Sequence, residues 1–256
     1  MSSAGWQDPT AIRDAAVRRL SQQIDALDVL VTRNRGHILE APPLPTRFSA
    51  VSGGIPRRTR LLTLMFVDIR NSARIEEMLL PEQTVHFLSA YLGAASTVIA
   101  DNDGAIYQFV GDGLIAMFGT SGEIDHGASR ALAAAIGIHG AFARTRLRFA
   151  MAQTVHAMVA IHTGLATIGV VDLSRRSDFV VVGDVVNVTS RLESEGKSLG
   201  LSTVLTGETV RSLSARPSWL RHVGTRCLRG ISHPVELWAP DAQTEAFIST
   251  QLRGAE

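Results

Sequence analysis

Two apolar segments separated by only three residues place the strongest limit on the fold of this chain. Ala105–Val110 and Leu114–Phe118 flank Gly111, Asp112 and Gly113. Apolar runs joined by so short a glycine-rich turn predict a β-hairpin, because glycine adopts the backbone conformations that tight turns require. The fold must therefore contain antiparallel strands, with the carboxylate of Asp112 at a hairpin tip.

The segments around this hairpin predict a mixed fold. Leu61–Val67 is an unbroken apolar run, typical of a buried strand, and it leads directly into Asp68. The spacing of apolar residues predicts helices over Pro81–Ala100, Ile124–Phe142 and Val185–Ser194, and strands over Val155–His162, Thr167–Val171 and Phe179–Val182. This order of elements predicts an α+β fold with a mainly antiparallel sheet.

The chain divides into four parts. Residues 8–34 are expected to hold an amphipathic helix, over Asp8–Thr32, whose heptad spacing suits either a dimer helix or a helix lying on its own domain. Residues 41–60, rich in Pro, Gly and Arg, are expected to form a linker or an extended strap. Residues 61–240 form the main domain, and 241–256 a C-terminal tail.

Composition excludes several classes of protein. Of the 256 residues, 45% are hydrophobic and 19% are charged, which excludes a disordered chain. The balance of 25 basic and 24 acidic residues argues against a nucleic-acid partner. Cys227 is the only cysteine, so neither a disulfide framework nor a thiolate metal site is expected. We find no signal peptide and no apolar run long enough to span a bilayer, and therefore expect a cytoplasmic protein without a membrane segment.

The basic residues are also unusual in kind. Lys197 is the only lysine and the other 24 are arginines. Any role that needs a primary amine must fall to Lys197 or to a substitute.

Asp68 and Asp112 are the first candidate site residues. If the hairpin pairs beside the strand that precedes Asp68, both carboxylates face the same end of the sheet. Two convergent carboxylates suit Mg²⁺ or Mn²⁺, which take oxygen ligands and bridge to substrate phosphates. Taken singly, Asp68 also suits a helix N-cap and Asp112 a plain turn residue, so the pair carries the metal hypothesis.

Asn187 and Arg191 are the second candidate pair. They stand four residues apart in a predicted helix, so both side chains lie on one face. Arginine offers a planar fork for phosphate oxygens, and asparagine can hold a hydroxyl or sugar oxygen. The alternative is a solvated helix face on which Arg191 pairs with Glu195.

Four segments that contain these residues occur in a recognisable order. They are Phe66–Ser72, Phe109–Gly113, Ile161–Gly164 and Val182–Glu193. Together they resemble the catalytic domain of the class III nucleotidyl cyclases, the adenylate and guanylate cyclase family. The resemblance covers about Arg60 to Pro240, and the last of the four segments is the most specific.

The resemblance implies a fold, a reaction and a site. The fold would be a ferredoxin-like antiparallel sheet with helices, preceded by the N-terminal helix. In the family, residues matching Asp68 and Asp112, with the backbone carbonyl of Ile69, hold two Mg²⁺ or Mn²⁺ ions per site. Residues matching Asn187 and Arg191 orient the ribose and stabilise the transition state. Family members are head-to-tail dimers with shared sites, which implies a homodimer here.

This chain departs from the family at the residues that read the base. The positions of the usual lysine and of its aspartate or threonine partner hold Gln108 and Val180. Gln108 can donate or accept a hydrogen bond, whereas Val180 offers only apolar contact. The guanylate pattern is also absent, and Tyr107 beside Gln108 is a candidate stacking group. Lys197 lies beyond the predicted helix Val185–Ser194 and is no evident replacement.

The expected function is conversion of a nucleoside triphosphate, most simply ATP, to its 3′,5′-cyclic monophosphate and pyrophosphate. The family's triphosphate-binding lysine is missing, and Arg229 or Arg226 is the candidate substitute. The alternatives are a cyclase for GTP or a pyrimidine triphosphate, or a degenerate module that binds nucleotide and dimerises without turnover. A two-metal polymerase or diguanylate cyclase is disfavoured because its Gly-Gly-acidic hairpin signature is absent.

Overall fold

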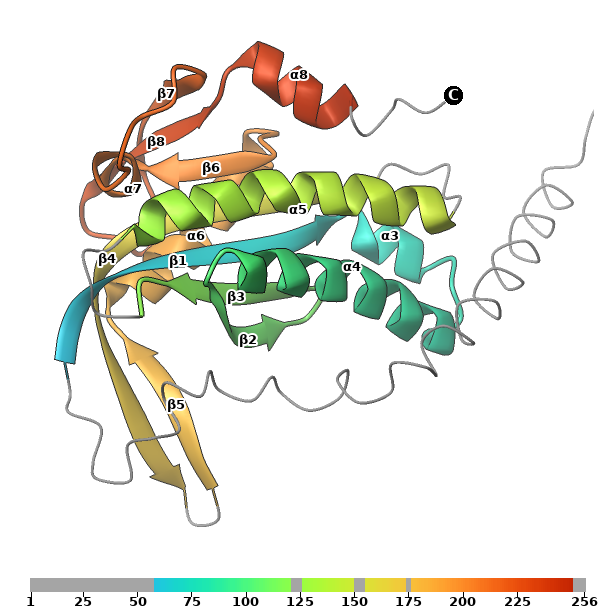
Figure 1. Ribbon diagram of the computed structural model, residues 1–256, viewed down its shortest axis with the longest axis horizontal. Helices are drawn as coiled ribbons and strands as arrows, with labels where there is room; N and C mark the ends of the chain where they lie inside the picture. The colour runs from blue at the N-terminus through green and yellow to red at the C-terminus, as the bar shows by residue number, and fades with distance from the viewer. Residues whose placement is uncertain (1–57, 121–125, 150–154, 174–175, 251–256) are drawn as a thin grey trace, which may run out of the picture.

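A computed structural model of the chain describes residues 58–120, 126–149, 155–173 and 176–250 (Figure 1). The predicted N-terminal helix at 8–34, nearly all of the linker at 41–60 and the end of the tail lie outside these ranges. No helix in the described ranges is long and apolar enough to cross a membrane.

The sheet has eight strands and is mostly antiparallel. Seven strands follow the order β2-β3-β1-β4-β6-β8-β7, and β5 pairs with β4. The strands are β1 (Arg58–Arg70), β2 (Ala105–Val110), β3 (Gly113–Phe118), β4 (His156–Leu173), β5 (Arg176–Val182), β6 (Thr203–Thr206), β7 (Leu220–Cys227) and β8 (Pro234–Pro240). Among the strands in the described ranges, only β4 and β6 pair in parallel. The predicted hairpin is present as β2 and β3, and β3 pairs with β1 as the metal hypothesis requires.

Helices cover both faces of the sheet. They are α3 (Ser72–Glu76), α4 (Pro81–Asp101), α5 (Gly127–Phe149), α6 (Asp184–Ser198), α7 (Gly207–Arg211) and α8 (Ala242–Thr250). Helices α4 and α5 lie side by side on one face, and α6 packs against the other (Figure 1). The paired strands β4 and β5 extend beyond the sheet as an arm. The α+β fold class is thus confirmed.

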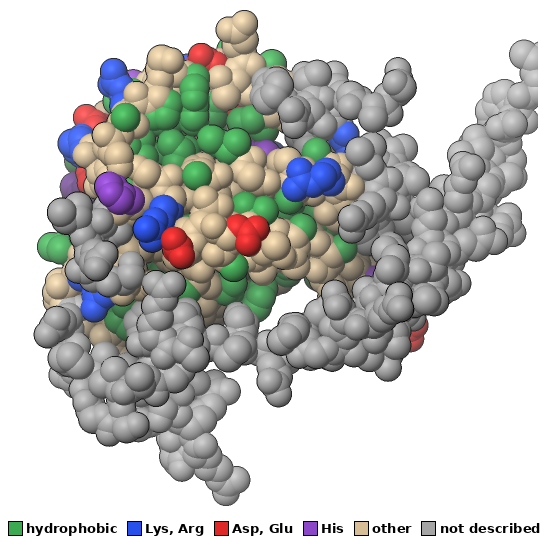
Figure 2. Space-filling view, viewed as in Figure 1, with side chains coloured by type: hydrophobic (Ala, Val, Ile, Leu, Met, Phe, Trp, Pro, Cys, Tyr) green, Lys and Arg blue, Asp and Glu red, His purple; other side chains and the backbone are tan. Residues whose placement is uncertain are grey.

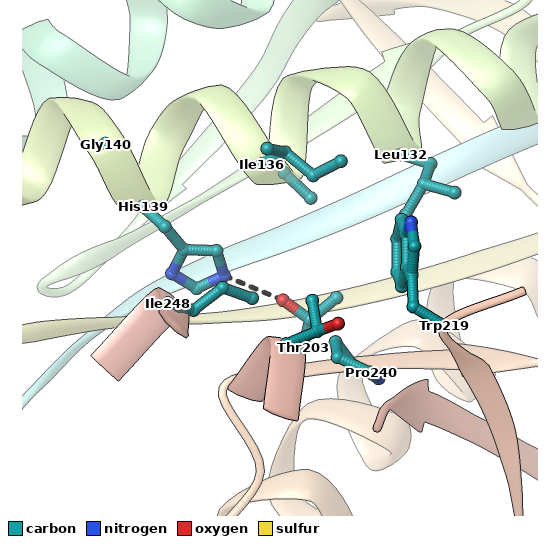
Figure 3. Close-up of a pocket in the computed structure, with 10 residues that line it drawn as sticks. Leu132, Ile136, His139, Gly140, Thr203, Trp219, Pro240 and Ile248 are labelled. Atoms are coloured by element: carbon teal, nitrogen blue, oxygen red, sulfur yellow. Dashed lines mark hydrogen bonds between the residues drawn. The ribbon is translucent and has the colours of Figure 1, made fainter. Parts of the chain in front are cut away.

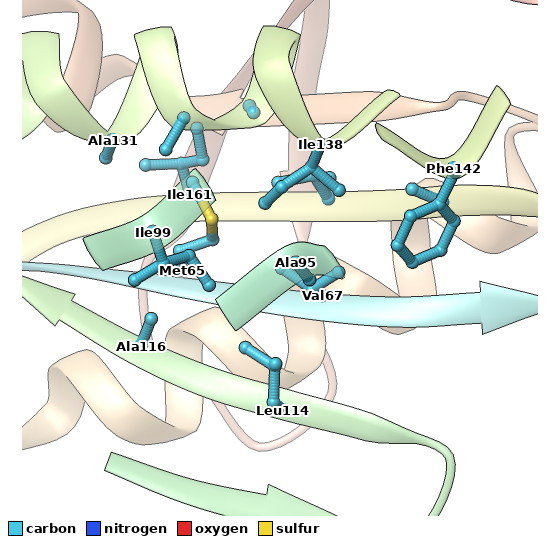
Figure 4. Close-up of a cluster of buried hydrophobic side chains, with 14 of the residues drawn as sticks. Met65, Val67, Ala95, Ile99, Leu114, Ala116, Ala131, Ile138, Phe142 and Ile161 are labelled. Carbon is cyan, nitrogen blue, oxygen red and sulfur yellow. The ribbon is translucent and has the colours of Figure 1, made fainter. Parts of the chain in front are cut away.

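The alternation of side chains along β1 separates the two cores. Met65, Val67 and Ile69 are buried under α4 and α5, in the cluster shown in Figure 4. Phe66 points the other way, into the cluster that contains Val188 and Leu192 of α6. Because successive strand residues face opposite sides, Asp68 lies on the α6 side of the sheet.

Two of the differences between predicted and observed boundaries matter for the site. The segments Val155–His162 and Thr167–Val171 belong to the one long strand β4, because Thr163 and Gly164 continue the pairing with β1. Helix α6 continues to Ser198, four residues past the predicted end, so Lys197 lies within this helix and not beyond it.

A small pocket opens where α5 meets the C-terminal strands. Figure 2 shows hydrophobic side chains gathered over this region, and Figure 3 shows the pocket's lining, which includes Ile136, Trp219 and Ile248. His139 lies at its wall, and its Nε2 is 2.7 Å from Thr203 Oγ1. None of the candidate site residues lines this pocket.

Candidate active site

The structure brings Asp68 and Asp112 to the same end of neighbouring strands. Asp68 of β1 pairs with Gly113 of β3, the residue that follows Asp112. A Cβ at Gly113 would lie only 2.7 Å from the carbonyl oxygen of Val67, so glycine permits this close approach of the strands. The predicted convergence of the two carboxylates therefore rests on strand pairing.

Asp112 is held by a residue that follows β1. The hydroxyl of Ser72, the buried first residue of α3, donates a hydrogen bond to Asp112 Oδ2. Asn71 takes up a left-handed conformation with φ of 65°, which turns the chain from β1 into α3. The bond from Ser72 to Asp112 was not predicted from the sequence.

Asp68 is buried and paired with the chain's only lysine. Asp68 is 5% exposed, and Lys197 Nζ lies 2.7 Å from Asp68 Oδ2. The same ammonium lies 2.6 Å from Oε1 of Glu193, one turn earlier on α6. The lysine therefore bridges a strand carboxylate and a helix carboxylate.

The charges in this cluster shift one another's titration. Burial raises the pKa of Asp68, as does the negative charge of Asp112, while the hydrogen bond from Lys197 opposes the rise. For Lys197, burial lowers the pKa, but the hydrogen bonds to Asp68 and Glu193 outweigh burial and the net pKa is raised. The lysine is therefore an ammonium at neutral pH.

Asn187 and Arg191 lie on the exposed side of α6, as their spacing predicts. In the described part of the chain Arg191 makes no ion pair, and Glu195 pairs with Arg226 of β7 at 3.7 Å. The alternative of an Arg191–Glu195 pair is therefore wrong. Asn187 precedes Lys197 by ten residues, about 15 Å along the helix axis.

The base-reading candidates come from β2 and β5. Gln108 is exposed on β2, and Val180 is partly exposed on β5. The backbone amide of Val181 donates to the hydroxyl of Tyr107 at 3.3 Å, so the side chain that precedes Gln108 reaches the backbone of β5 next to Val180. The Tyr107 hydroxyl thus has a structural hydrogen bond, a role that its proposal as a stacking group did not foresee.

The candidate phosphate ligands come from β7 and from the turn between β7 and β8, at one edge of the sheet. Arg229 is exposed in the turn between β7 and β8. Arg226 is held against α6 by Glu195, which leaves Arg229 as the less constrained of the two.

The residues at the end of β1 suit a divalent metal ion. Two carboxylates approach each other closely enough for one to raise the pKa of the other. The family resemblance adds the backbone carbonyl of Ile69, which precedes the last residue of β1, as an expected third oxygen ligand. The described residues contain no cluster of three or more His, Cys, Asp or Glu side chains suited to a metal. Two carboxylates and a carbonyl form an incomplete oxygen set, which leaves coordination positions for substrate oxygens.

Fold and site together define a mixed α+β catalytic domain with a carboxylate pair. Residues 56–239 match the family model described as the adenylate and guanylate cyclase catalytic domain, so the chain belongs to this family, the class III nucleotidyl cyclases. The resemblance seen in the sequence is thereby confirmed.

Curated relatives of the chain include bacterial adenylate cyclases. The chain is 31% identical to adenylate cyclase 1 of Rhizobium meliloti over 78% of its length and 30% of that protein. It is 32% identical to the adenylate cyclase of Anabaena cylindrica over 63% of its length and 32% of that protein. The chain thus spans about a third of these relatives.

Solved structures agree on the fold. The adenylyl cyclase CyaB from P. aeruginosa matches with a TM-score of 0.64 and 26% identity, covering 75% of this chain and 99% of that one. The guanylyl cyclase Cya2 matches with a TM-score of 0.63 and 26% identity, covering 73% and 94%. One of these two similar structures is named as an adenylyl cyclase and the other as a guanylyl cyclase.

Proposed function

We propose that this chain is a nucleotidyl cyclase that converts a nucleoside triphosphate, with ATP as the leading substrate, to its 3′,5′-cyclic monophosphate and pyrophosphate. The observation that carries this proposal is the convergence of Asp68 and Asp112 on adjacent strand ends. Membership of the cyclase family and the exposed Asn187 and Arg191 support it.

In the proposed reaction the ribose 3′-hydroxyl gives up its proton to water and its oxygen attacks the α-phosphorus. The bond from that phosphorus to the bridging oxygen breaks, and pyrophosphate leaves. When bound, the two divalent ions supply activation of the 3′-hydroxyl and positive charge for the triphosphate. Asp68, Asp112 and the Ile69 carbonyl would hold these ions, and Arg229 is the proposed triphosphate ligand.

Asn187 and Arg191 would complete the site of a second copy. Asn187 would orient the ribose, and the Arg191 guanidinium would support the charge that develops on the phosphate. Within one chain, Asn187 lies about 15 Å along α6 from the lysine that contacts Asp68, which favours separate half-sites. A homodimer would contain two such shared sites.

An exposed apolar patch supports dimerisation. Leu61, Leu165 and Val182 are 48%, 66% and 62% exposed and occupy neighbouring register positions where β1, β4 and β5 pair. Exposed apolar side chains that lie together on a surface are typical of protein–protein interfaces.

A product assay tests the proposal. Purified protein with Mn²⁺ would be incubated separately with ATP, GTP, CTP and UTP, and the products identified by mass. We expect a 3′,5′-cyclic nucleotide, with cyclic AMP in the largest amount. A dimeric protein that yields no cyclic product from any of the four would contradict catalysis and favour the degenerate binding module. A larger yield from another triphosphate would contradict only the assignment of ATP.

A further inference from the structure

The only lysine of the chain lies where a metal ion would bind. Its ammonium contacts Asp68 Oδ2 at 2.7 Å and Glu193 Oε1 at 2.6 Å. Both carboxylate residues are less than a tenth exposed, whereas the lysine side chain is 38% exposed. The lysine therefore reaches into the cluster from its edge.

The cluster needs a cation when no metal is bound. Asp68, Asp112 and Glu193 bring three carboxylates to the region where β1 meets α6, and Lys197 is the positive group in contact with two of them. Buried carboxylates without a counter-charge are costly, because burial disfavours the ionised form. The lysine ammonium supplies one positive charge. Because the lysine side chain is flexible, rotation about its bonds can move this charge away from the carboxylates.

Helix α6 does not depend on this lysine contact for its place on the sheet. Arg70 Nη1 of β1 donates to the backbone carbonyl of Lys197 at 3.3 Å. At the adjacent Gly196 the helix lies so close to the sheet that a Cβ would be 2.1 Å from Met158 and 2.8 Å from Val204. The side chain of Lys197 can leave Asp68 while the backbone that carries it stays fixed.

We propose that Lys197 is a positioning residue that acts as the resident cation of the metal site. It holds Asp68 in the metal-free protein and is displaced when a divalent ion takes the carboxylate. This inference rests on the proposed function, because it requires a metal at Asp68 and Asp112. Metal binding would then release the ammonium from Asp68 and leave it paired with Glu193.

The single lysine gives a direct readout of displacement without any substitution. An amine-reactive acylating reagent would be applied to the nucleotide-free protein, and modification of Lys197 followed by peptide mass spectrometry over a Mg²⁺ titration. An ammonium bound by two carboxylates is shielded, so we expect the rate of modification to rise severalfold as Mg²⁺ saturates. Sodium chloride at equal ionic strength should not raise it, and Asp112→Asn should abolish the Mg²⁺ effect.

A second measurement uses Mn²⁺ affinity in the absence of nucleotide, from the electron paramagnetic resonance of free Mn²⁺. Lys197→Met removes the competing charge, so we expect Mn²⁺ to bind severalfold more tightly, and Lys197→Arg to bind as wild type does. Glu195→Gln is the matched control, because it removes the Glu195–Arg226 ion pair from the same helix without touching Asp68. Its Mn²⁺ affinity should not change.

The outcomes separate this inference from the proposed function. If wild type binds Mn²⁺ but the modification rate of Lys197 does not respond to Mg²⁺, the displacement is wrong and the proposed function stands. If Lys197→Met binds Mn²⁺ no more tightly than wild type, the competition is likewise wrong. If wild type binds no Mn²⁺ at all, both the resident cation and the two-metal site are overturned. Should Lys197→Met fail to fold, the wild-type titration decides.

Discussion

At the scale of single residues, the site depends on contacts between polar groups far apart in sequence. Asp112 receives a hydrogen bond from Ser72, and Asp68 is bound by Lys197. Groups that hydrogen-bond to a metal ligand orient it without touching the metal, and their mutation commonly lowers the affinity for the metal. Ser72 is therefore expected to matter although it would touch neither metal nor nucleotide.

Ser72→Ala should weaken Mn²⁺ binding by about tenfold, because Asp112 loses the hydrogen bond that orients it. The measurement is a Mn²⁺ titration of the nucleotide-free protein. Ser96→Ala is the matched control, since its hydroxyl donates to the Leu92 carbonyl within α4, away from Asp112. Equal affinities for the two variants would contradict the role of Ser72.

Base preference is also decided by single side chains. Restoring a charged reader and an acceptor, with Gln108→Lys and Val180→Asp together, should raise the ratio of kcat/KM for ATP over GTP by at least about tenfold. Steady-state kinetics with both substrates would measure it. An unchanged ratio would show that these two positions do not read the base here.

These residues also show where sequence reasoning succeeds. Asp68 and Asp112 could be placed together because a strand and a hairpin dictate where their ends meet. Lys197 could not, since the helix was predicted to end at Ser194, where apolar periodicity stops. Glu193 and Gly196 continue the buried face of α6. A carboxylate and a glycine give no hydrophobic signal, so neither the helix length nor the lysine contact was predictable.

At the scale of elements, the position of α6 depends on close packing at one glycine. Gly196→Val should lower the free energy of unfolding by about 2 kcal/mol, because the added side chain overlaps Met158 and Val204. Urea unfolding measures this. Gly93→Ala in α4 is the control, since a Cβ there meets nothing within 4 Å, and it should stabilise by about 0.5 kcal/mol. Equal effects at both positions would contradict the packing of α6.

Two buried histidines, His139 on α5 and His162 on β4, predict that the stability of the fold depends on pH. Burial lowers the pKa of His139, and that of His162 on β4, to about 4. Below the ordinary value near 6.5 the unfolded chain takes up protons that the folded protein does not. Stability should therefore fall between pH 7.5 and pH 5, by about 2 kcal/mol for each histidine.

His139→Gln tests the share of this loss that His139 carries. The amide can still bond to Thr203 but does not titrate, so the drop in free energy of unfolding should be about half that of wild type. Urea unfolding at pH 7.5 and pH 5 measures the drop. A drop as large as in wild type would show that His139 is not buried as a neutral imidazole.

At the scale of the whole molecule, we propose that each chain carries two complementary half-sites. The metal carboxylates lie at the ends of β1 and of the β2–β3 hairpin, while Asn187 and Arg191 are exposed on α6. The main helices and strands up to α6, and the shared face of Asn187 and Arg191, follow from the sequence pattern, whereas the order of the strands in the sheet does not. The dimer rests on the family and on the exposed patch of Leu61, Leu165 and Val182, and so requires its own test.

Complementation between two inactive variants is the most direct such test. Asp68→Ala removes a metal ligand and Arg191→Ala removes the group offered to the second copy, so each protein alone should be inactive. A mixed dimer contains one intact site, and random pairing at equal amounts should restore about a quarter of wild-type cyclic nucleotide formation. Two variants that exchange subunits, yet give no more product together than apart, would contradict the shared active site.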